Sequence, residues 1–331
     1  MVSVFELEFS KTAPPSHESL KLTAESMDWS KQREKLLGNS QDLELPPNFK
    51  LPVLPTAVTT FTQKANEPDA NVAELGKILE TDAGLTAEIL QLVNSSVFGL
   101  RRQATSVKHA MSLLGVSKAR NYVLTTAVKR TMSRCESKLI NLNHFWSANL
   151  EKALFAREVA ILMKADAETA YAASMLQDFL LPALTSALFK QYSEFVDYQA
   201  TKPQLITQFE QTIFEWDHAV AAAHIAHQWN FPDEMVCCLH QHHRGLEILL
   251  VPEFAHSCVA AVAISALLPD VINQVPDGLT RLIQLETVWR EFKLQELAEK
   301  VDQDFRELGG DQMHHITLKS RLEKHFKTAG V

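Results

Sequence analysis

The sequence predicts an all-α protein, and three observations lead to this prediction. Apolar side chains recur every three or four positions along most of the chain, which is typical of helices that bury one face. Alternating β-branched runs are scarce, and stretches such as residues 218–229 are rich in alanine. The 10 glycines and 13 prolines punctuate the chain and do not form low-complexity tracts.

A length of 331 residues suits one large domain or two ordinary ones. We expect an N-terminal extension at 1–48, a set of short helices at 49–140, a larger helical part at 141–270 and a C-terminal helical extension at 271–331. Within the extension, Phe5, Leu7 and Phe9 alternate with glutamates and hint at a short strand.

Local signals set the helix boundaries. The prolines of residues 51–55 make a rigid entry, after which a helix is expected over 56–65. Asp82 is placed to cap a helix that ends near Asn94. Further helices are expected over 26–37, 204–216, 235–243 and 254–268, and one that starts near Ser117 and runs to about Arg130.

Composition and charge argue against several classes of protein, namely non-specific nucleic-acid-binding, secreted and membrane-spanning proteins. A net charge of −8 and a pI near 5.9 argue against non-specific binding of nucleic acid. The hydrophobic fraction of 46% is ordinary for a soluble protein. The N-terminus lacks the pattern of a signal peptide, and the longest apolar stretch, 258–268, is too short to span a membrane. Four cysteines form no disulfide framework, so we expect a cytoplasmic protein.

One carboxylate lies within an apolar stretch that should be helical, residues 174–181. This residue, Asp178, needs a partner if its face is buried. Asp217 and His218 should begin a second helix, and His240, His242 and His243 should end a third. Helices that bring a carboxylate and imidazoles to one place can build a metal site inside a bundle. The alternative is a buried aspartate bonded to an imidazolium.

The pattern resembles an HD-type phosphohydrolase domain, which has a His-Asp pair on a central helix and further histidines around it, holding one or two metals. Here Gln177 replaces the histidine of the pair, Ala148 replaces an earlier one, and Leu180-Leu181 replace the usual Gly-Lys. The resemblance therefore implies a remnant site. Its members are Gln177, Asp178, His218, His242 and His243.

Because two ligands are missing, we expect no cofactor and no metal-dependent hydrolysis; any metal would be held by Asp178, His218 and His242. A separate zinc site is an alternative, since Cys238 and His242 lie four residues apart and His256 and Cys258 follow on the next helix. These cysteines could equally be core residues.

Motifs at 51–55 (LPVLP), 80–86 (ETDAGLT) and 92–100 (LVNSSVFGL), with the run from Ser106 to Gly115, are similar to the HDOD family of bacterial signalling proteins. The resemblance extends over about residues 51–256. It implies short helices joined to a degenerate HD core, and regulation through protein partners or a small ligand such as a nucleotide. It does not imply catalysis.

A basic stretch is the clearest charge feature, because Glu136 is the one acidic residue between Leu100 and Leu139. This stretch is either a solvated helical face or a surface for an acidic partner protein. Nucleic acid is not expected, because Tyr122 is the one aromatic residue there. A nucleic-acid-binding regulator and a residual phosphohydrolase acting on nucleotides remain the rival functions. The basic residues are Arg101, Arg102, Lys108, Lys118, Arg120, Lys129, Arg130, Arg134 and Lys138.

Overall fold

The computed structural model describes residues 27–38, 49, 53–67, 69–95, 103–308 and 315–329, and the regular elements among them are all helices, as predicted. The strand expected near Phe5 lies outside the described residues. In chain order the first group of helices is α3 (Trp29–Leu37), α4 (Thr56–Ala65), α5 (Val72–Leu79), α6 (Ala83–Val93), α7 (Val107–Leu114) and α8 (Val116–Met132).

The larger group follows with α9 (Leu142–Met163), α10 (Ala167–Leu176), α11 (Leu181–Ala187), α12 (Phe189–Gln199), α13 (Ile206–Phe214), α14 (His218–Gln228), α15 (Asp233–Gln241), the 3₁₀ helix η2 (His242–Leu250) and α16 (Cys258–Ser265). The chain closes with α17 (Gly278–Val288), α18 (Leu294–Glu307) and α19 (Leu318–Ala329).

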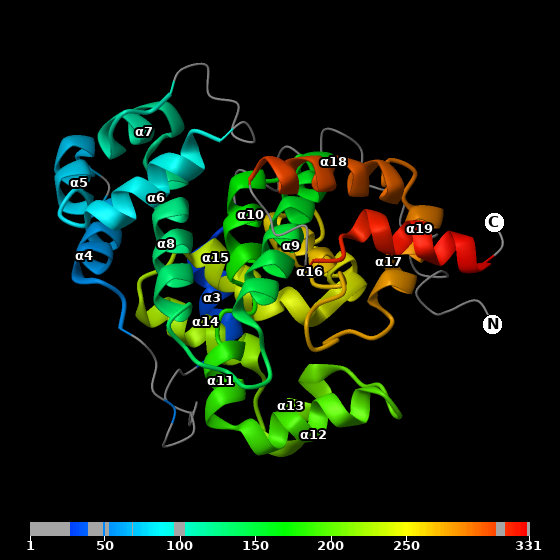
Figure 1. The fold of residues 1–331 in the computed structure, drawn as a ribbon. Coiled ribbons are helices and arrows are strands. Elements are labelled where there is room, and N and C mark those ends of the chain that lie inside the picture. The colour runs from blue at the N-terminus through cyan, green and yellow to red at the C-terminus, as the bar shows by residue number, and fades with distance from the viewer. Residues whose placement is uncertain are drawn as a thin grey trace.

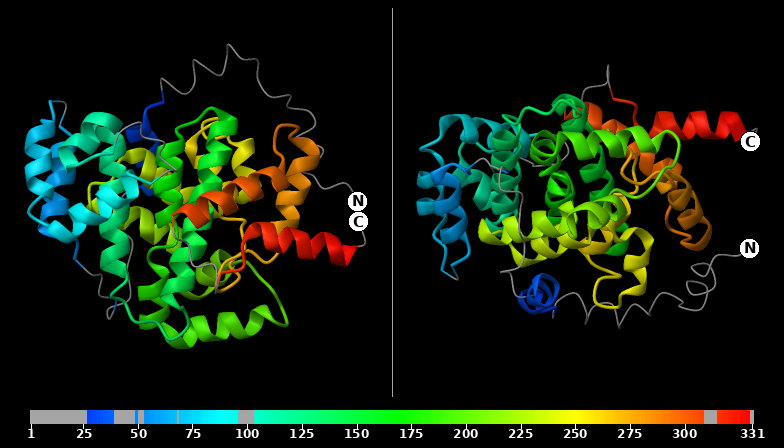
Figure 2. Two further views of the ribbon diagram at one scale, coloured as in Figure 1. Left: turned by 45° about the horizontal axis from the view of Figure 1, so that its top comes forward. Right: turned by 90° about the horizontal axis from the view of Figure 1, so that it is seen from below.

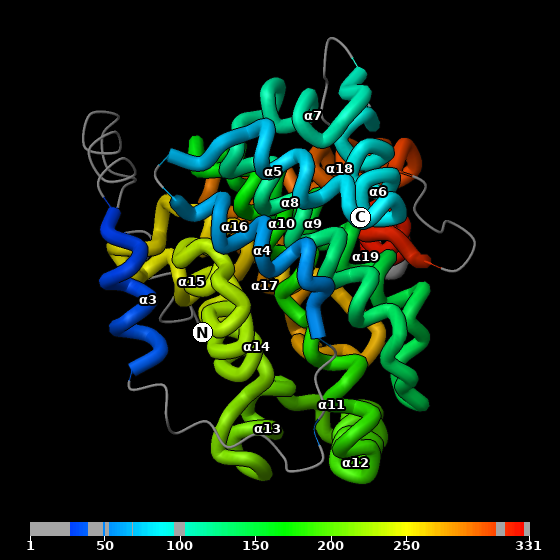
Figure 3. The backbone as a smooth tube through the Cα atoms, turned by 90° about the vertical axis from the view of Figure 1, so that its left-hand side faces the viewer, coloured from blue at the N-terminus to red at the C-terminus, as the bar shows by residue number. Residues whose placement is uncertain are grey.

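The helices α9 and α10 form a central pair, and a group of helices lies on each side of it (Figure 1). Helices α4 to α7 pack around α8 at one side, and α17 to α19 lie at the other. Two further views show the same separation between the short helices and the C-terminal helices (Figure 2). Helix α10 contacts α8, α9, α15 and α16, so it links the two groups. Helix α3 packs beside α15 and α14 (Figure 3).

Polar side chains fix where most of these helices start. Asn71, Asp82, Ser106, Asn141 and Asp166 each accept a hydrogen bond from a backbone N–H of the first turn that follows. Such caps satisfy donors that the helix itself leaves free. Helix α4 has the boundaries predicted from its prolines, because Pro55 precedes its first residue.

Three helix predictions need correction. The stretch 174–181 is not one helix: α10 ends at Leu176, residues 177–180 form a turn with i→i−3 hydrogen bonds, and α11 begins at Leu181 with Pro182 in its first turn. Helix α15 ends at Gln241, so the histidines that follow start η2. Helix α16 begins only at Cys258, because Ser257 caps it there.

The C-terminal helix is held by a buried side chain of α9. Glu151, 3% exposed, accepts a hydrogen bond from the backbone N–H of Leu318, the first residue of α19. His315 Nε2 lies 2.8 Å from the other oxygen of Glu151. A carboxylate is favourable at a helix N-terminus, so this contact fixes the start of α19 on the core.

No single described helix is both long and apolar enough to cross a membrane. One pair, Ala167–Ala187 with Phe189–Gln199, meets the length and composition together but is bent by 112°.

Candidate functional site

The structure brings Asp178, His218, His242 and His243 into one group in the core of the larger region. Asp178 lies in the turn between α10 and α11, His218 is the first residue of α14, and the other two begin η2. One ligand atom from each lies within 4.8 Å of those of the other three. Among the described residues this is the one group of three or more His, Cys, Asp or Glu side chains that could hold a metal ion.

Local sequence positions these side chains. Asp217 accepts a hydrogen bond from the N–H of Val220, so His218 faces inward at the first turn of α14. Gly245 has φ +55° and ψ −133°, a conformation that side chains with a Cβ rarely adopt. The chain therefore turns sharply at Gly245, so that His242 and His243 lie before this turn and the rest of η2 lies after it.

The imidazole nitrogens lie close to each other and to one carboxylate oxygen. His218 Nε2 lies 3.3 Å from His242 Nε2 and 3.0 Å from His243 Nε2. Asp178 Oδ1 lies 3.4 Å from both His218 Nε2 and His242 Nε2. This oxygen is buried and has no hydrogen-bond partner among the described residues. Four groups therefore point to a common centre.

A buried lysine holds the other oxygen of the same carboxylate. Lys152, 1% exposed on α9, places Nζ 3.0 Å from Asp178 Oδ2 and 3.2 Å from Asp270 Oδ2. Burial acts to lower the pKa of Lys152, but the charges of the two aspartates raise it above its usual value. Burial likewise acts to raise the pKa of Asp178, yet Lys152 and the adjacent imidazoles hold it well below its usual range.

His218 lies between two carboxylates. Its Nδ1 is 2.7 Å from Glu210 Oε2, and Glu210 also accepts hydrogen bonds from the Tyr192 hydroxyl and the His218 backbone N–H. Burial acts to lower the pKa of His218, but the charges of Glu210 and Asp178 raise it to about 10. Burial and the neighbouring imidazoles of His242 and His218 lower the pKa of His243 well below its usual value.

The replaced positions have structural roles. Gln177 is fully buried; its amide donates to Asp178 Oδ2 over 3.3 Å, and its carbonyl oxygen accepts from Ser265 over 3.4 Å. Ala148 is buried on α9 one turn before Lys152. Ala148 offers no polar group, and the polar contact from α9 to Asp178 comes from Lys152.

Lys152, Glu210 and Asp270 belong to the site but were not predicted from the sequence. Glu210 follows Phe209 on the inner side of α13, and Asp270 follows Pro269 after an apolar helix, so both positions could have suggested buried acids. A lysine on a helix usually signals exposure, and no local pattern marks Lys152 as buried.

The structure does not bring Cys238, Cys258 and His242 together as the ligands of a zinc site. The Sγ atoms of Cys238 and Cys258 are 3.7 Å apart, but His242 directs Nδ1 to the Leu239 carbonyl oxygen at 2.7 Å and Nε2 to His218. Burial raises the pKa of Cys237 to about 12 and that of Cys238 well above its usual value. These thiols stay protonated and pack as core residues.

Within the basic stretch, two arginines are engaged inside the molecule. Arg120 contacts Asn66 at 2.5 Å and Glu234 at 4.0 Å, and Arg130 pairs with Asp82 at 2.9 Å. Arg101 and Arg102 lie outside the described residues, and Lys138 lies over the Phe189 ring. The basic residues that the structure exposes are Lys108, Lys118, Lys129, Arg134 and Lys138.

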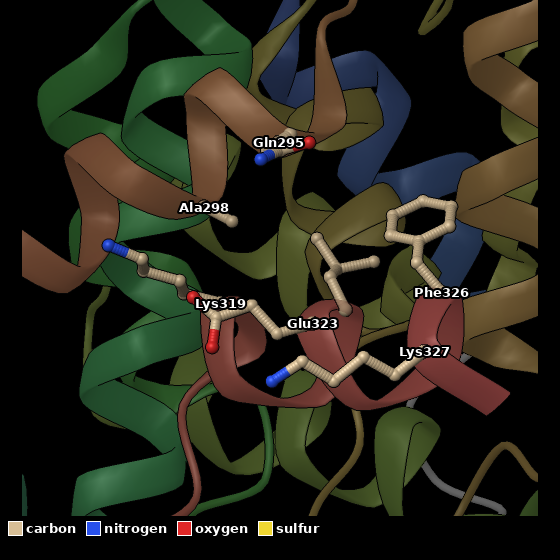
Figure 4. A pocket seen from close by; sticks show the side chains of 7 residues that line it. Gln295, Ala298, Lys319, Glu323, Phe326 and Lys327 are labelled. Carbon is tan, nitrogen blue, oxygen red and sulfur yellow. The ribbon is translucent and has the colours of Figure 1, made fainter. Parts of the chain in front are cut away.

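A pocket of about 440 Å³ lies between α18 and α19 (Figure 4). Its lining combines Leu322 and Phe326 with Lys319, Glu323 and Lys327. None of its lining residues belongs to the Asp178 group, so it is a separate feature of the C-terminal helices.

A comparison with protein-family models matches residues 51–245 to the HDOD domain. The chain belongs to the HDOD family. In this HDOD protein the matched segment includes α4 to α15 and all four residues of the Asp178 group. A curated relative, an uncharacterised protein of Treponema pallidum (strain Nichols), is 21% identical over 198 residues, which are 58% of this chain and 37% of the relative. The chain thus matches little more than a third of that relative's length.

Solved structures share the fold. An HDOD domain protein of unknown function from Geobacter sulfurreducens has a TM-score of 0.54 and 19% identity, over 91% of this chain and 95% of the other. A provisionally named phosphohydrolase from Shewanella amazonensis SB2B has a TM-score of 0.60 and 20% identity, over 78% and 94%. A provisionally named signal transduction protein from Marinobacter aquaeolei VT8 has a TM-score of 0.54 and 18% identity, over 85% and 65%. At these identities the likeness establishes the fold and not the activity.

The metal that HD-type relatives use fits the residues present here. Three imidazoles and a carboxylate are ligands that transition metals prefer, and Asp178 Oδ1 is a buried acceptor with no hydrogen-bond partner among the described residues. Such an ion would act as a Lewis acid where it also bound a substrate.

Proposed function

We propose that this HDOD protein is a regulatory module that does not hydrolyse phosphoesters and that acts through a partner protein with an acidic surface. One observation carries the first part of the proposal. Lys152 and Gln177 both donate to Asp178 Oδ2, so the chain's own side chains occupy one oxygen of this carboxylate and leave only Oδ1 for a metal ion. Metal-dependent hydrolysis requires an open coordination position for water or substrate.

The names of the fold neighbours include both a signal transduction protein and phosphohydrolases. Those names are compatible with either signal transduction or phosphoester hydrolysis and do not distinguish between them. The buried ion pair of Lys152 favours regulation.

The test of the first part is an assay of nucleotides and cyclic dinucleotides with Mn²⁺, Mg²⁺, Fe²⁺ and Ni²⁺. We expect the same background turnover from the wild type and from Asp178→Ala. Turnover that needs both a metal ion and Asp178 would overturn the proposal and support a phosphohydrolase.

The partner surface is proposed from the exposed basic residues Lys118, Lys129 and Arg134 on and after α8. Reversing all three to Glu should weaken capture of the acidic partner and make the remaining binding less dependent on salt. The matched control reverses three exposed lysines elsewhere, Lys190, Lys202 and Lys293. Equal loss in both variants would show that only net charge matters, and the surface assignment would be wrong.

A further inference from the structure

We infer that the Asp178 group holds one four-coordinate divalent transition-metal ion, Zn²⁺ by its donor chemistry, and that the Lys152 ammonium takes the place of a second cation on the opposite face of Asp178. This inference goes beyond the proposed function, because it assigns a metal without assigning turnover. The metal ligands would be Asp178 Oδ1 and the Nε2 atoms of His218, His242 and His243.

The hydrogen bonds behind two of the imidazoles prepare their Nε2 atoms to bind a metal. His242 Nδ1 lies 2.7 Å from a backbone carbonyl oxygen, that of Leu239, so this nitrogen carries the proton and donates. His218 Nδ1 lies 2.7 Å from the Glu210 carboxylate and donates in the same way. Metal-binding histidines nearly always donate the other ring N–H to a carboxylate or a carbonyl. In both rings Nε2 therefore faces the common centre, where a metal ion would displace any proton that this nitrogen carries.

The spacing of the ligand atoms is that of a tetrahedral site. Metal–nitrogen distances of about 2.0–2.1 Å place neighbouring ligands of a tetrahedron roughly 3.3 Å apart. The observed separations are 3.0 and 3.3 Å between imidazole nitrogens, and 3.4 Å from Asp178 Oδ1 to each of two nitrogens. One proton shared among these atoms satisfies two of them, whereas a divalent cation at the centre satisfies four. The cation also supplies the partner that Asp178 Oδ1 lacks.

The other face of Asp178 already holds a cation. Lys152 Nζ bridges Asp178 Oδ2 and Asp270 Oδ2, and Gln177 also donates to Asp178 Oδ2. Asp270 is fixed in turn, because its Oδ1 accepts backbone hydrogen bonds from Ile272 and Gln274. Without the ammonium, two buried carboxylates would face the same space, which is an arrangement that favours a divalent ion.

Four protein ligands close the coordination shell of a tetrahedral ion. Structural zinc sites have such closed shells, while catalytic sites keep one position for water. A bound ion would therefore link the turn that follows α10 to α14 and η2, and would leave no position for a substrate.

The first experiment uses the full chain, freed of metal by chelation and then titrated separately with Zn²⁺ and Co²⁺. We expect one Zn²⁺ per chain by elemental analysis after dialysis, and the strong visible absorption of tetrahedral Co²⁺. His243→Ala should weaken metal binding and shift the visible spectrum of Co²⁺, because water would take the place of one imidazole, and Glu210→Gln should weaken affinity by about 10–100-fold. His227→Ala, on the same helix as His218 but outside the group, is the matched control and should bind like the wild type. No bound metal, or the weak spectrum of six-coordinate Co²⁺, would overturn the inference.

The second experiment tests Lys152. Lys152→His replaces the ammonium with a neutral ligand and should bind two Zn²⁺ per chain, while Lys152→Arg keeps the charge and should bind one. If Lys152→His folds only with metal, its helical circular dichroism should recover at two equivalents of Zn²⁺. Recovery at one equivalent, or no recovery, would show that Lys152 does not replace a cation. Phosphoester turnover in either variant would bear on the proposed function and leave the metal count as it stands.

Discussion

The short-helix region of this HDOD protein exposes its ionisable side chains, whereas the larger helical region buries several of them. In α4 to α7, no ionisable side chain among the described residues is buried, and pairs such as Lys64–Glu74 lie at the surface. In the larger region, Lys152, Asp178, Glu210 and His218 are buried together. The Lys64–Glu74 pair is the shorter, 2.6 Å against 3.0 Å for Lys152–Asp178. Burial of the pair, and not the distance between its atoms, therefore decides how much free energy of unfolding is lost when one partner is removed.

Lys152→Met should show the largest effect. The substitution leaves Asp178 and Asp270 buried without their shared cation, and breaking a buried pair typically costs about 3–5 kcal/mol. Urea unfolding followed by circular dichroism measures the loss. Lys118→Met, at an exposed lysine, is the control and should stay close to the wild type. A loss below about 1 kcal/mol for Lys152→Met would contradict the importance of burial in this comparison.

The buried thiol of Cys237 should give the next effect, as a dependence on pH. Burial raises the pKa of this thiol to about 12, whereas an unfolded cysteine ionises near about 8.5. Its contribution to stability is therefore complete below about pH 8.5 and is lost as pH rises towards 12.

Between pH 8.5 and 10.5 the free energy of unfolding of the wild type should fall by about 1–2 kcal/mol more than that of Cys237→Ala. The measurement is urea unfolding across this pH range. Parallel curves for the two proteins would mean that the thiol ionises in the folded state as readily as in the unfolded one.

Asp82 should show a smaller effect, because it lies at the edge of the short-helix region. It caps α6 and pairs with Arg130, and the hydrogen bonds from Leu85 and Arg130 lower its pKa. Asp82→Ala should cost about 1 kcal/mol, which is typical for a lost cap. Asp82→Asn keeps a capping oxygen and should retain most of the stability; an equal loss in both variants would assign the effect to the ion pair.

The smallest effect is expected at the surface pair. Lys64→Ala breaks the contact with Glu74 but leaves a fully solvated carboxylate, so the urea midpoint should stay near that of the wild type. A shift as large as that of Lys152→Met would remove the distinction between the two regions.

The sequence predicted the elements that local signals determine. Helix α4 begins after Pro55 and α14 after Asp217 because a proline or a capping carboxylate fixes each start. Such signals also place His218 and His242 near helix ends. The prediction of a continuous helix through Asp178 was wrong because the turn at 177–180 is set by packing around Gln177 and by Pro182.

The charge balance of the site could not be predicted from local patterns. Lys152 is paired in the core with Asp178, 26 residues further along the chain, and with Asp270, 118 residues further along. Similarly, the basic stretch predicts a surface, but Arg120 and Arg130 pair with acids on other helices. In both cases, contacts between distant segments determine which charges are exposed.

Glu151 and Lys152 are consecutive residues of α9, and both are buried. Glu151 holds the start of α19, while Lys152 reaches the group around Asp178. Successive helical residues point about 100° apart, so a rotation or one-residue slip of α9 would break both contacts together. The C-terminal helix and the buried ionic group should therefore open as one cooperative unit in native-state hydrogen exchange, although they lie on different sides of α9.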